Sequence, residues 1–234
     1  MRADADAEVD TDAVGSTPDV EVDPVQRALD AFRAGDPVCV HDFADREGET
    51  DIIYPAAAVD EAAVAHMRND AGGLICVAVS DAVGDAFDLP FLADAIDHPA
   101  VDDDPEYDDR SSFSLPVNHR ETFTGITDDD RALTITELAG AASDPDAVDF
   151  AEAFRSPGHV TLLRGAPGLL SDRLGHTELG LAVAAAADQP PAVVVCEMLD
   201  DETGGALSPA AARAYAEREG LAYVEGSALV ERLE

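Results

Sequence analysis

Apolar residues recur along this chain with two spacings, which separate predicted helices from predicted strands. A period of three to four residues, bounded by aspartate, proline or glycine, indicates helices, and short runs that are almost wholly apolar indicate buried strands. The predicted helices span residues 24–35, 60–73, 128–142, 177–189 and 209–220, with a last turn at 227–234. The predicted strands span residues 37–43, 52–59, 74–80, 111–118, 159–165, 192–199 and 221–225.

These elements predict one folded domain, which we place at residues 23–234. Strands and helices are intermixed without strict alternation and without an internal repeat. The expected fold is therefore α+β (mixed α/β), a mixed β-sheet with flanking helices. Residues 1–22 alternate alanine, valine and aspartate, which is typical of a solvated acidic tail. Residues 97–109 carry seven acidic side chains in thirteen positions, which indicates a surface loop.

The charge balance of the chain excludes several classes of protein. It has 14 basic side chains, all of them arginine, against 50 acidic ones, for a formal charge of −36. Because it has no lysine, the chain cannot be a Schiff-base aldolase, a pyridoxal-phosphate enzyme or a Walker-type phosphate-loop protein. A surface of this sign repels nucleic-acid backbones and anionic membranes, so neither is expected as a partner.

The acidity also indicates a halophilic protein. Hydrophobic residues make up 46% of the chain, enough for a sizeable core, so the charge does not indicate wholesale disorder. About −0.15 charges per residue on a sequence that can pack suggests a cytosol of molar salt, in which the screening length is roughly 3 Å. An ordinary acidic protein is the alternative, and the absence of lysine argues against it.

Cysteines and apolar segments give no sign of secretion or of a zinc ribbon. The three cysteines, Cys39, Cys76 and Cys196, are far apart, and each is set in an apolar run. We therefore expect them to be small buried hydrophobic residues. The sequence has no signal peptide and no uninterrupted apolar run of about 18 residues, which predicts a soluble cytoplasmic protein.

A dense polar segment follows the strand predicted at 37–43. Arg46 is followed by Glu47, Glu49 and Asp51, which place three carboxylates at alternate positions beside a guanidinium. Carboxylate oxygens are preferred ligands of Mg²⁺ and Mn²⁺, and an adjacent arginine suits a phosphate. On its own, the segment is also what a solvated loop looks like in so acidic a chain.

A second polar segment, residues 173–177 (Arg-Leu-Gly-His-Thr), lies at the mouth of a predicted helix. Helix N-termini with free N–H groups collect anions, and an arginine adds a bidentate clamp for phosphate. His176 offers a ring nitrogen to a cation held by Glu47. Two segments distant in the sequence therefore point to one ion.

Two more ionisable residues stand in unusual settings. His159 belongs to a second Gly-His pair, and Glu197 interrupts the apolar strand at 192–199. Burial raises the pKa of such a carboxyl toward that of a general base near neutrality, unless an edge position exposes Glu197 to water. From the residues alone, we predict a metal-assisted enzyme that acts on a small phosphorylated, oxygen-rich substrate.

Six segments lie in an order and at a spacing that point to one family. They are DREGETD (45–51), GGLICVAVS (72–80), TFTGITDDDRALTI (122–135), RSPGHVTLLRG (155–165), RLGHTE (173–178) and VVVCEML (193–199). Together they resemble the motifs of 3,4-dihydroxy-2-butanone 4-phosphate synthase, the riboflavin-pathway enzyme, from about residue 23 to the C-terminus. Many relatives carry a fused cyclohydrolase half with clustered zinc-binding cysteines. This sequence has no such cluster, so we expect a stand-alone synthase.

The resemblance implies an activity, a cofactor and an assembly. The family converts D-ribulose 5-phosphate to L-3,4-dihydroxy-2-butanone 4-phosphate and formate. It uses Mg²⁺ or Mn²⁺, with two ions expected per site when substrate is bound, and no organic cofactor. Removing a proton from the ketose gives an enediolate, whose negative charge a bound cation stabilises. The family is homodimeric with sites near the subunit interface, so a homodimer is implied.

The resemblance also implies residue roles, carried over position by position. Glu47 and His176 match the metal ligands. The residues that match catalytic or pocket positions are His159, Glu197, Glu49, Asp42 and Cys76. The residues that match substrate-binding positions are Arg46, Glu47, Asp51, Thr124, Arg173, Leu174, Gly175, His176, Thr177 and Glu197, with Arg173 and Thr177 expected on the phosphate.

Two other functions stay open from the sequence. A non-catalytic acidic protein that binds cations or a partner accounts for the charge, but not for Arg173, His176 and Glu197 in their settings. A metal-dependent phosphosugar isomerase shares the enediolate step and releases no formate. A formate assay with ribulose 5-phosphate, with and without a chelator, separates these functions from the synthase.

The charge of the chain leads to a first prediction. In dilute buffer we expect the fold to be lost, because repulsion among the acidic side chains is then no longer screened. Circular dichroism in the far ultraviolet across a potassium chloride titration measures this loss. A chain that stays fully folded in dilute buffer would contradict the halophilic interpretation.

Overall fold

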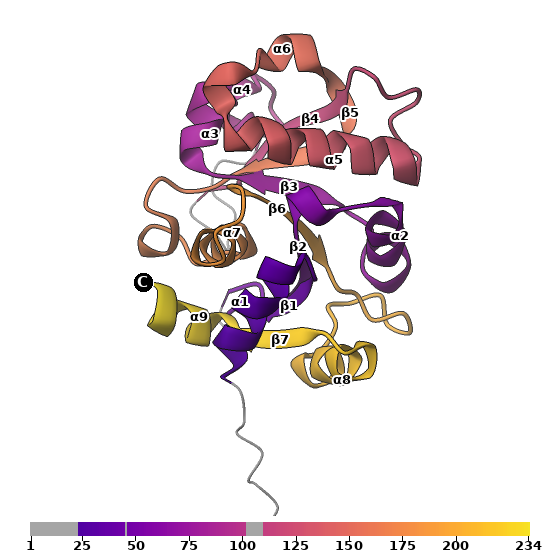
Figure 1. The fold of residues 1–234 in the computed structure, drawn as a ribbon, viewed down its shortest axis with the longest axis vertical. Coiled ribbons are helices and arrows are strands. Elements are labelled where there is room, and N and C mark those ends of the chain that lie inside the picture. Colours follow the sequence, from indigo (N-terminus) through magenta and orange to yellow (C-terminus); the bar gives the residue numbers. More distant parts are fainter. Residues whose placement is uncertain (1–22, 45, 102–109) are drawn as a thin grey trace, which may run out of the picture.

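A seven-stranded mixed sheet runs through the structure, a computed structural model that describes residues 23–44, 46–101 and 110–234 (Figure 1). The predicted acidic tail (1–22) and most of the predicted acidic loop (102–109) lie outside the described residues. The strands follow the order β4 (Phe113–His119), β5 (Phe154–Arg164), β3 (Cys76–Val79), β6 (Ala192–Glu197), β2 (Thr50–Pro55), β1 (Val38–His41) and β7 (Ala222–Glu225). The pairs β3–β5 and β1–β7 are parallel and the other neighbours are antiparallel.

Helices cover both faces of the sheet, and each face has its own buried apolar cluster. On one face lie α1 (Pro24–Ala34), α7 (His176–Ala186) and α9 (Gly226–Leu233). On the other lie α2 (Glu61–Asp70), α5 (Asp128–Ser143) and α8 (Pro209–Glu219). The short helices α3 (Asp81–Ala86), α4 (Leu92–Ala95) and α6 (Phe150–Ala153) lie toward the β4–β5 end (Figure 1). The α+β class with a mixed sheet and flanking helices is therefore confirmed.

The central strands are apolar on both faces, which explains their nearly continuous apolar runs. In β6, Val193 and Val195 pack in the cluster beneath α7, whereas Val194 and Cys196 pack in the cluster on the opposite face. Side chains alternate between faces along a strand, so position alone decides which face a residue reaches. Odd-numbered residues of β6 and β2 consequently face α7.

The predicted elements are confirmed apart from their ends and some short pieces. β2 ends at Pro55 and continues as a 3₁₀ turn, Ala56–Ala58, where the prediction extends the strand to residue 59. β5 begins at Phe154, not at residue 159, because a polar stretch that looks like a turn pairs with β4. The helices α3, α4 and α6 are not predicted, since four to six residues are too few to show a helical period.

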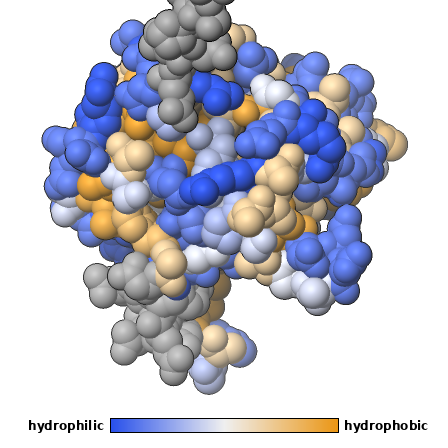
Figure 2. Space-filling model, turned by 90° about the horizontal axis from the view of Figure 1, so that it is seen from below, coloured by the Kyte–Doolittle hydropathy of each residue, from blue (hydrophilic) through white to orange (hydrophobic). Residues whose placement is uncertain are grey.

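Apolar and polar side chains separate as the sequence predicts. The three cysteines are free and buried, Cys39 and Cys196 in one apolar cluster and Cys76 in the other. The face of the molecule drawn in Figure 2 is largely hydrophilic, with smaller hydrophobic areas between. Across the described part of the chain, no helix combines the length and the apolar character needed to cross a membrane.

Candidate active site

The candidate site forms where several strands end beneath the start of α7. Asp42 follows β1, Asp51 is the second residue of β2, and Glu197 is the last of β6. Asp51 and Glu197 are cross-strand partners, and their positions direct both toward α7. Cys76, the first residue of β3, packs on the same face. His176 is the first residue of α7, so strand ends and a helix start converge on one region.

The loop between β1 and β2 is closed on itself by Asp42. The Asp42 side chain accepts a hydrogen bond from the Glu49 N–H at 2.9 Å, and the Asp42 N–H donates to the Glu49 carbonyl oxygen at 3.0 Å. Gly48 has a φ of 68°, in the left-handed region that favours glycine. Arg46 Nη1 lies 2.9 Å from Glu47 Oε2 and 3.3 Å from Asp42 Oδ2. The loop thereby holds its carboxylates in defined positions. Its Asp45 lies outside the described residues.

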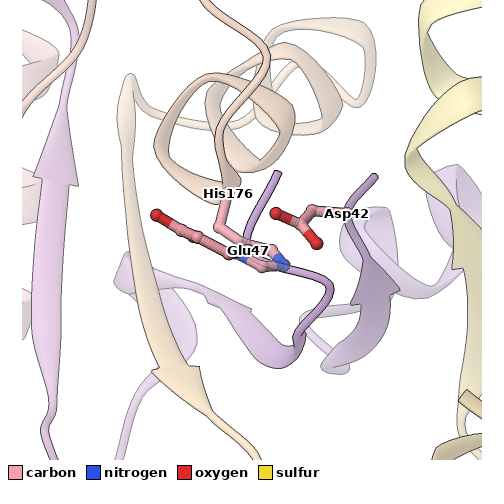
Figure 3. A group of neighbouring side chains, drawn as sticks. All are labelled: Asp42, Glu47 and His176. Atoms are coloured by element: carbon pink, nitrogen blue, oxygen red, sulfur yellow. The ribbon is translucent and has the colours of Figure 1, made fainter. Parts of the chain in front are cut away.

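Three side chains of this region are arranged as ligands of a cation. Asp42, Glu47 and His176 each bring one ligand atom within 4.8 Å of the others (Figure 3). His176 Nδ1 lies 3.7 Å from Glu47 Oε2 and 3.5 Å from Asp51 Oδ1. Among the described residues, the buried atoms Asp51 Oδ1 and His176 Nε2 have no hydrogen-bond partner. Buried polar atoms are rarely left so, and carboxylate and imidazole groups bind Mg²⁺ and Mn²⁺, so the site fits a divalent cation.

Burial and the closeness of the carboxylates to one another shift the pKa values of the site. Burial raises the pKa of Asp51 to about 7, with neighbouring carboxylates adding to the effect. Burial and nearby negative charge also raise the pKa values of Glu49 and Glu197. Burial acts upward on Glu47 too, but hydrogen bonding to His176 and the adjacent arginine outweigh it and lower its pKa. For His176, burial acts downward, but the surrounding carboxylates outweigh it and raise the pKa to about 9.

A cavity of about 90 Å³ lies among these groups. The predicted site residues that line it are Glu47, Asp51, Cys76, Arg173, His176, Thr177 and Glu197. A wider hollow is lined by Arg46, Glu47, Glu49, Phe113 and Glu197. Carboxylate, imidazole, guanidinium and hydroxyl groups therefore face one space, as the sequence predicts for acid–base chemistry on a phosphorylated substrate.

The start of α7 brings the guanidinium and the hydroxyl to this cavity. Gly175 is the N-cap residue and offers no side-chain hydrogen bond to the first turn of the helix. Arg173 and Thr177, on either side of it, both line the cavity. Leu174 is half-buried and packs against the apolar cluster, so its side chain does not line the cavity.

Two predicted site residues lie elsewhere in the same copy of the chain. His159 is exposed on β5, where its N–H donates to Asn118 Oδ1 at 2.8 Å. Thr124 is exposed in the segment before α5, where its N–H donates to Asp130 Oδ2 at 2.9 Å. Neither lines the cavity described above. A single copy thus gathers the acidic residues, His176 and Arg173, but neither His159 nor Thr124.

Several residues that line the cavity are not predicted from the sequence, namely Ser111, Ser112, Phe113, Leu163 and Val195. Ser112 and Phe113 come soon after the acidic loop, and the sequence there predicts a strand but gives no indication of a functional site. Val195 resembles any core valine, and only its pairing with Cys76 across the sheet identifies its place. Burial raises the pKa of the Cys76 thiol well above its usual range, so this thiol stays protonated in the wall of the cavity.

A family model and several known proteins match the chain over most of its length. The model of 3,4-dihydroxy-2-butanone 4-phosphate synthase matches residues 26–232. A protein of that name from Archaeoglobus fulgidus is 50% identical over 219 residues, which cover 88% of this chain and 92% of that protein. Another, from Methanosarcina mazei, is 47% identical over 221 residues, which cover 88% of this chain and 90% of that protein.

Solved structures of proteins with the same name have a similar fold. One, in complex with two magnesium ions, has a TM-score of 0.79 and 31% sequence identity, covering 91% of this chain and 97% of that one. The synthase of Candida albicans has a TM-score of 0.76 and 29% identity, covering 91% of this chain and 98% of that one. Fold and sequence similarity therefore agree.

The pKa of His176 predicts how stability depends on pH when a chelator removes divalent cations. Its folded pKa of about 9 exceeds the ordinary value of 6.5, so its contribution is present below pH 6.5 and is lost as the pH rises through 9. We expect the free energy of unfolding to fall by about 1–3 kcal/mol between pH 7 and 9. Denaturant unfolding at constant molar salt measures it.

The variant His176→Gln provides the control for this window. Asp51 acts in the same direction, but mainly below pH 7, so the range from pH 7 to 9 isolates the histidine. The variant should show a clearly flatter dependence there. An equal slope in both proteins would show that another group titrates.

Proposed function

Because the chain belongs to the 3,4-dihydroxy-2-butanone 4-phosphate synthase family, we propose that the cavity beneath α7 is its catalytic site. The chain is an enzyme of riboflavin biosynthesis that converts D-ribulose 5-phosphate to L-3,4-dihydroxy-2-butanone 4-phosphate and formate. The observation that carries the proposal is that Glu47, Glu197 and His176, from three distant segments, face one cavity.

Glu47 and His176 hold a divalent cation in this proposal, with Asp42 and Asp51 close enough to act on the same ion. The support is the distance between the Glu47 and His176 atoms and the two buried atoms without a hydrogen-bond partner. When bound, such a cation stabilises negative charge that develops on substrate oxygens as a carbon-bound proton leaves. We assign Mg²⁺ or Mn²⁺, with two ions per site when substrate is present, because a similar solved synthase holds two magnesium ions.

The phosphate of the substrate binds at the start of α7. Arg173 and Thr177 supply a guanidinium and a hydroxyl from the cavity wall, and Gly175 leaves the helix N-terminus open to an anion. Leu174 contributes only through its backbone, since its half-buried side chain packs against the apolar cluster and not into the cavity. Arg46 and Asp51, at the acidic side, bind the hydroxyl groups of the sugar.

Several proton transfers are needed, because the reaction loses one water, rearranges the carbon skeleton, adds one water and releases formate. Glu197 is the main general base, because burial raises its pKa toward neutrality and it lies between the two hollows. Glu49 has a raised pKa for the same reason and serves as a second group. Asp42 holds the acidic loop in place, and Cys76 forms part of the wall.

A homodimer completes the site in this proposal. The segment that carries Thr124 also exposes two large apolar side chains, Phe123 (92% exposed) and Ile126 (51% exposed). Neighbouring apolar side chains at a surface often mark an interface, which supports a subunit contact here. Asn118 lies against both this segment and His159. A second copy that covers this surface brings His159 and Thr124 to the cavity of its partner. We place the enzyme in the cytoplasm of a halophilic cell, in keeping with its charge of −36.

A formate assay tests the activity and the cation site. At molar potassium chloride, the protein with Mg²⁺ should release one formate per ribulose 5-phosphate, and a chelator should abolish this reversibly. Glu47→Gln and His176→Gln should lose cation binding, measured by calorimetry. Glu197→Gln should keep cation binding and lose about 10²–10⁴-fold in turnover, because it lacks a proton acceptor. Near-normal turnover of Glu197→Gln would contradict its role, and substrate consumed without formate would indicate an isomerase.

Mixing two inactive variants tests the shared site. If His159 acts across the interface, Glu197→Gln mixed with His159→Asn should regain activity, because one of the two sites in each mixed dimer has both groups intact. Glu197→Gln mixed with Glu47→Gln should regain none, since both changes damage the same cavity. Mixed dimers, confirmed by mass spectrometry, that stay inactive would contradict a role of His159 across the interface. Full activity of His159→Asn by itself would place His159 outside the reaction.

A further inference from the structure

Glu178 is a buried carboxylate in the first turn of α7 that the chemistry above does not use. It is fully buried, and it contacts two partners. Its Oε1 accepts a hydrogen bond from the Ala166 N–H at 3.0 Å, and its Oε2 accepts one from Arg173 Nη1 at 2.6 Å. A buried carboxylate is costly unless it is paired and hydrogen-bonded, and here both oxygens are satisfied. The ion pair with Glu178 therefore fixes the Nη1 end of the Arg173 guanidinium.

Gly175 gives this guanidinium the space it occupies. A β-carbon at position 175 would lie 2.2 Å from Arg173 Nη1, far inside contact distance. Gly175 has a φ of −94°, which any residue adopts, so glycine is needed here for room and not for backbone conformation. Arg173, which precedes α7, consequently places its guanidinium over the start of that helix, near Gly175 and Glu178.

The held guanidinium stands between two hollows. Arg173 lines the catalytic cavity of about 90 Å³ and also a neighbouring pocket of about 340 Å³. Glu178 lines only the second. An arginine side chain has many rotamers, and ordering it before the ligand arrives removes that entropic cost from binding. Arg173 Nη1 donates to Glu178 Oε2, and a guanidinium carries five N–H donors in a fixed fork geometry that suits an anion.

We propose that Glu178 is a positioning residue, which holds Arg173 in the orientation that binds the phosphate of the substrate. The inference rests on the proposed role of Arg173 at the phosphate. The space left by Gly175 and the carboxylate of Glu178 together hold the guanidinium in place, and we call this pair of contacts the seat of Arg173. Substrate affinity thus depends on a side chain that lines no part of the catalytic cavity.

The change Glu178→Gln tests the seat. A glutamine keeps an oxygen for the Ala166 N–H and loses the ion pair with Arg173. We expect KM for ribulose 5-phosphate to rise about tenfold, as loss of one charged hydrogen bond allows, with a smaller change in kcat. Gly175→Ala should act in the same direction, because its methyl group displaces the guanidinium. If Glu178→Gln does not fold, the KM of Gly175→Ala still tests whether the position of the guanidinium affects substrate binding.

A double-mutant cycle separates positioning from a purely structural role. In an Arg173→Met background, Glu178→Gln should add less than about twofold to KM, because there is no guanidinium left to position. An unchanged additional effect in that background would overturn the inference. Asp81→Asn, which removes one acidic partner of the half-buried Arg164, is the matched control and should leave KM unaltered.

The remaining outcomes distinguish this inference from the proposed function. If Arg173→Met raises KM but Glu178→Gln and Gly175→Ala do not, the seat is wrong and the phosphate role of Arg173 stands. If Arg173→Met leaves KM unchanged, both the phosphate role and the seat are wrong. Thermal unfolding of every variant at molar salt verifies that the folded protein is compared.

Discussion

Mutual repulsion among carboxylates is the constraint on which this structure depends. Five acidic side chains of the described residues surround one region: Asp42, Glu47, Glu49, Asp51 and Glu197. Burial, with the charges of neighbouring carboxylates adding to it, raises the pKa values of Glu49, Asp51 and Glu197. Keeping these groups ionised in the folded state therefore costs free energy. Arg46 and His176 oppose the repulsion from within the group. The rest of that cost is offset by apolar burial on both faces of the sheet.

The sheet keeps these charges together because Asp51 and Glu197 lie on strands, and the loop that carries the other three is held between β1 and β2. The antiparallel register of β2 and β6 sets Asp51 opposite Glu197. α7 is pressed close to the same two strands at Gly180, where a β-carbon would lie 3.0 Å from Val193 Cγ2 and 3.2 Å from Ile53 Cγ2. The glycine thus brings the helix, with its first residues, down onto the strand ends. Groups placed on strands and helices are held more rigidly than groups on loops, which suits a site that needs defined distances.

Most of the fold and half of the site geometry are predictable from the sequence, for physical reasons. Continuous apolar runs identify the strands because both faces of the sheet are covered, and the ionisable residues stand out because they interrupt such runs, as Glu197 does. The strand order is not predictable, since it depends on long-range pairing. The extension of β5 to Phe154 is also missed, because it depends on pairing with β4. Val195 and Leu163 line the cavity because of their positions in the strands, and their apolar side chains alone would not identify them. The position of His159 outside the cavity follows from the path of β5.

The parallel pairing of β1 with β7 bears on the order in which the site is assembled during synthesis. β1 leads into the acidic loop, and its outer neighbour is formed by Ala222–Glu225, the last strand in the described part of the chain. While the ribosome makes the preceding residues, β1 has an open edge with unpaired backbone groups. Because β7 follows β6 along the chain, the carboxylates of Asp42, Asp51 and Glu197 are synthesised before the strand that covers this edge.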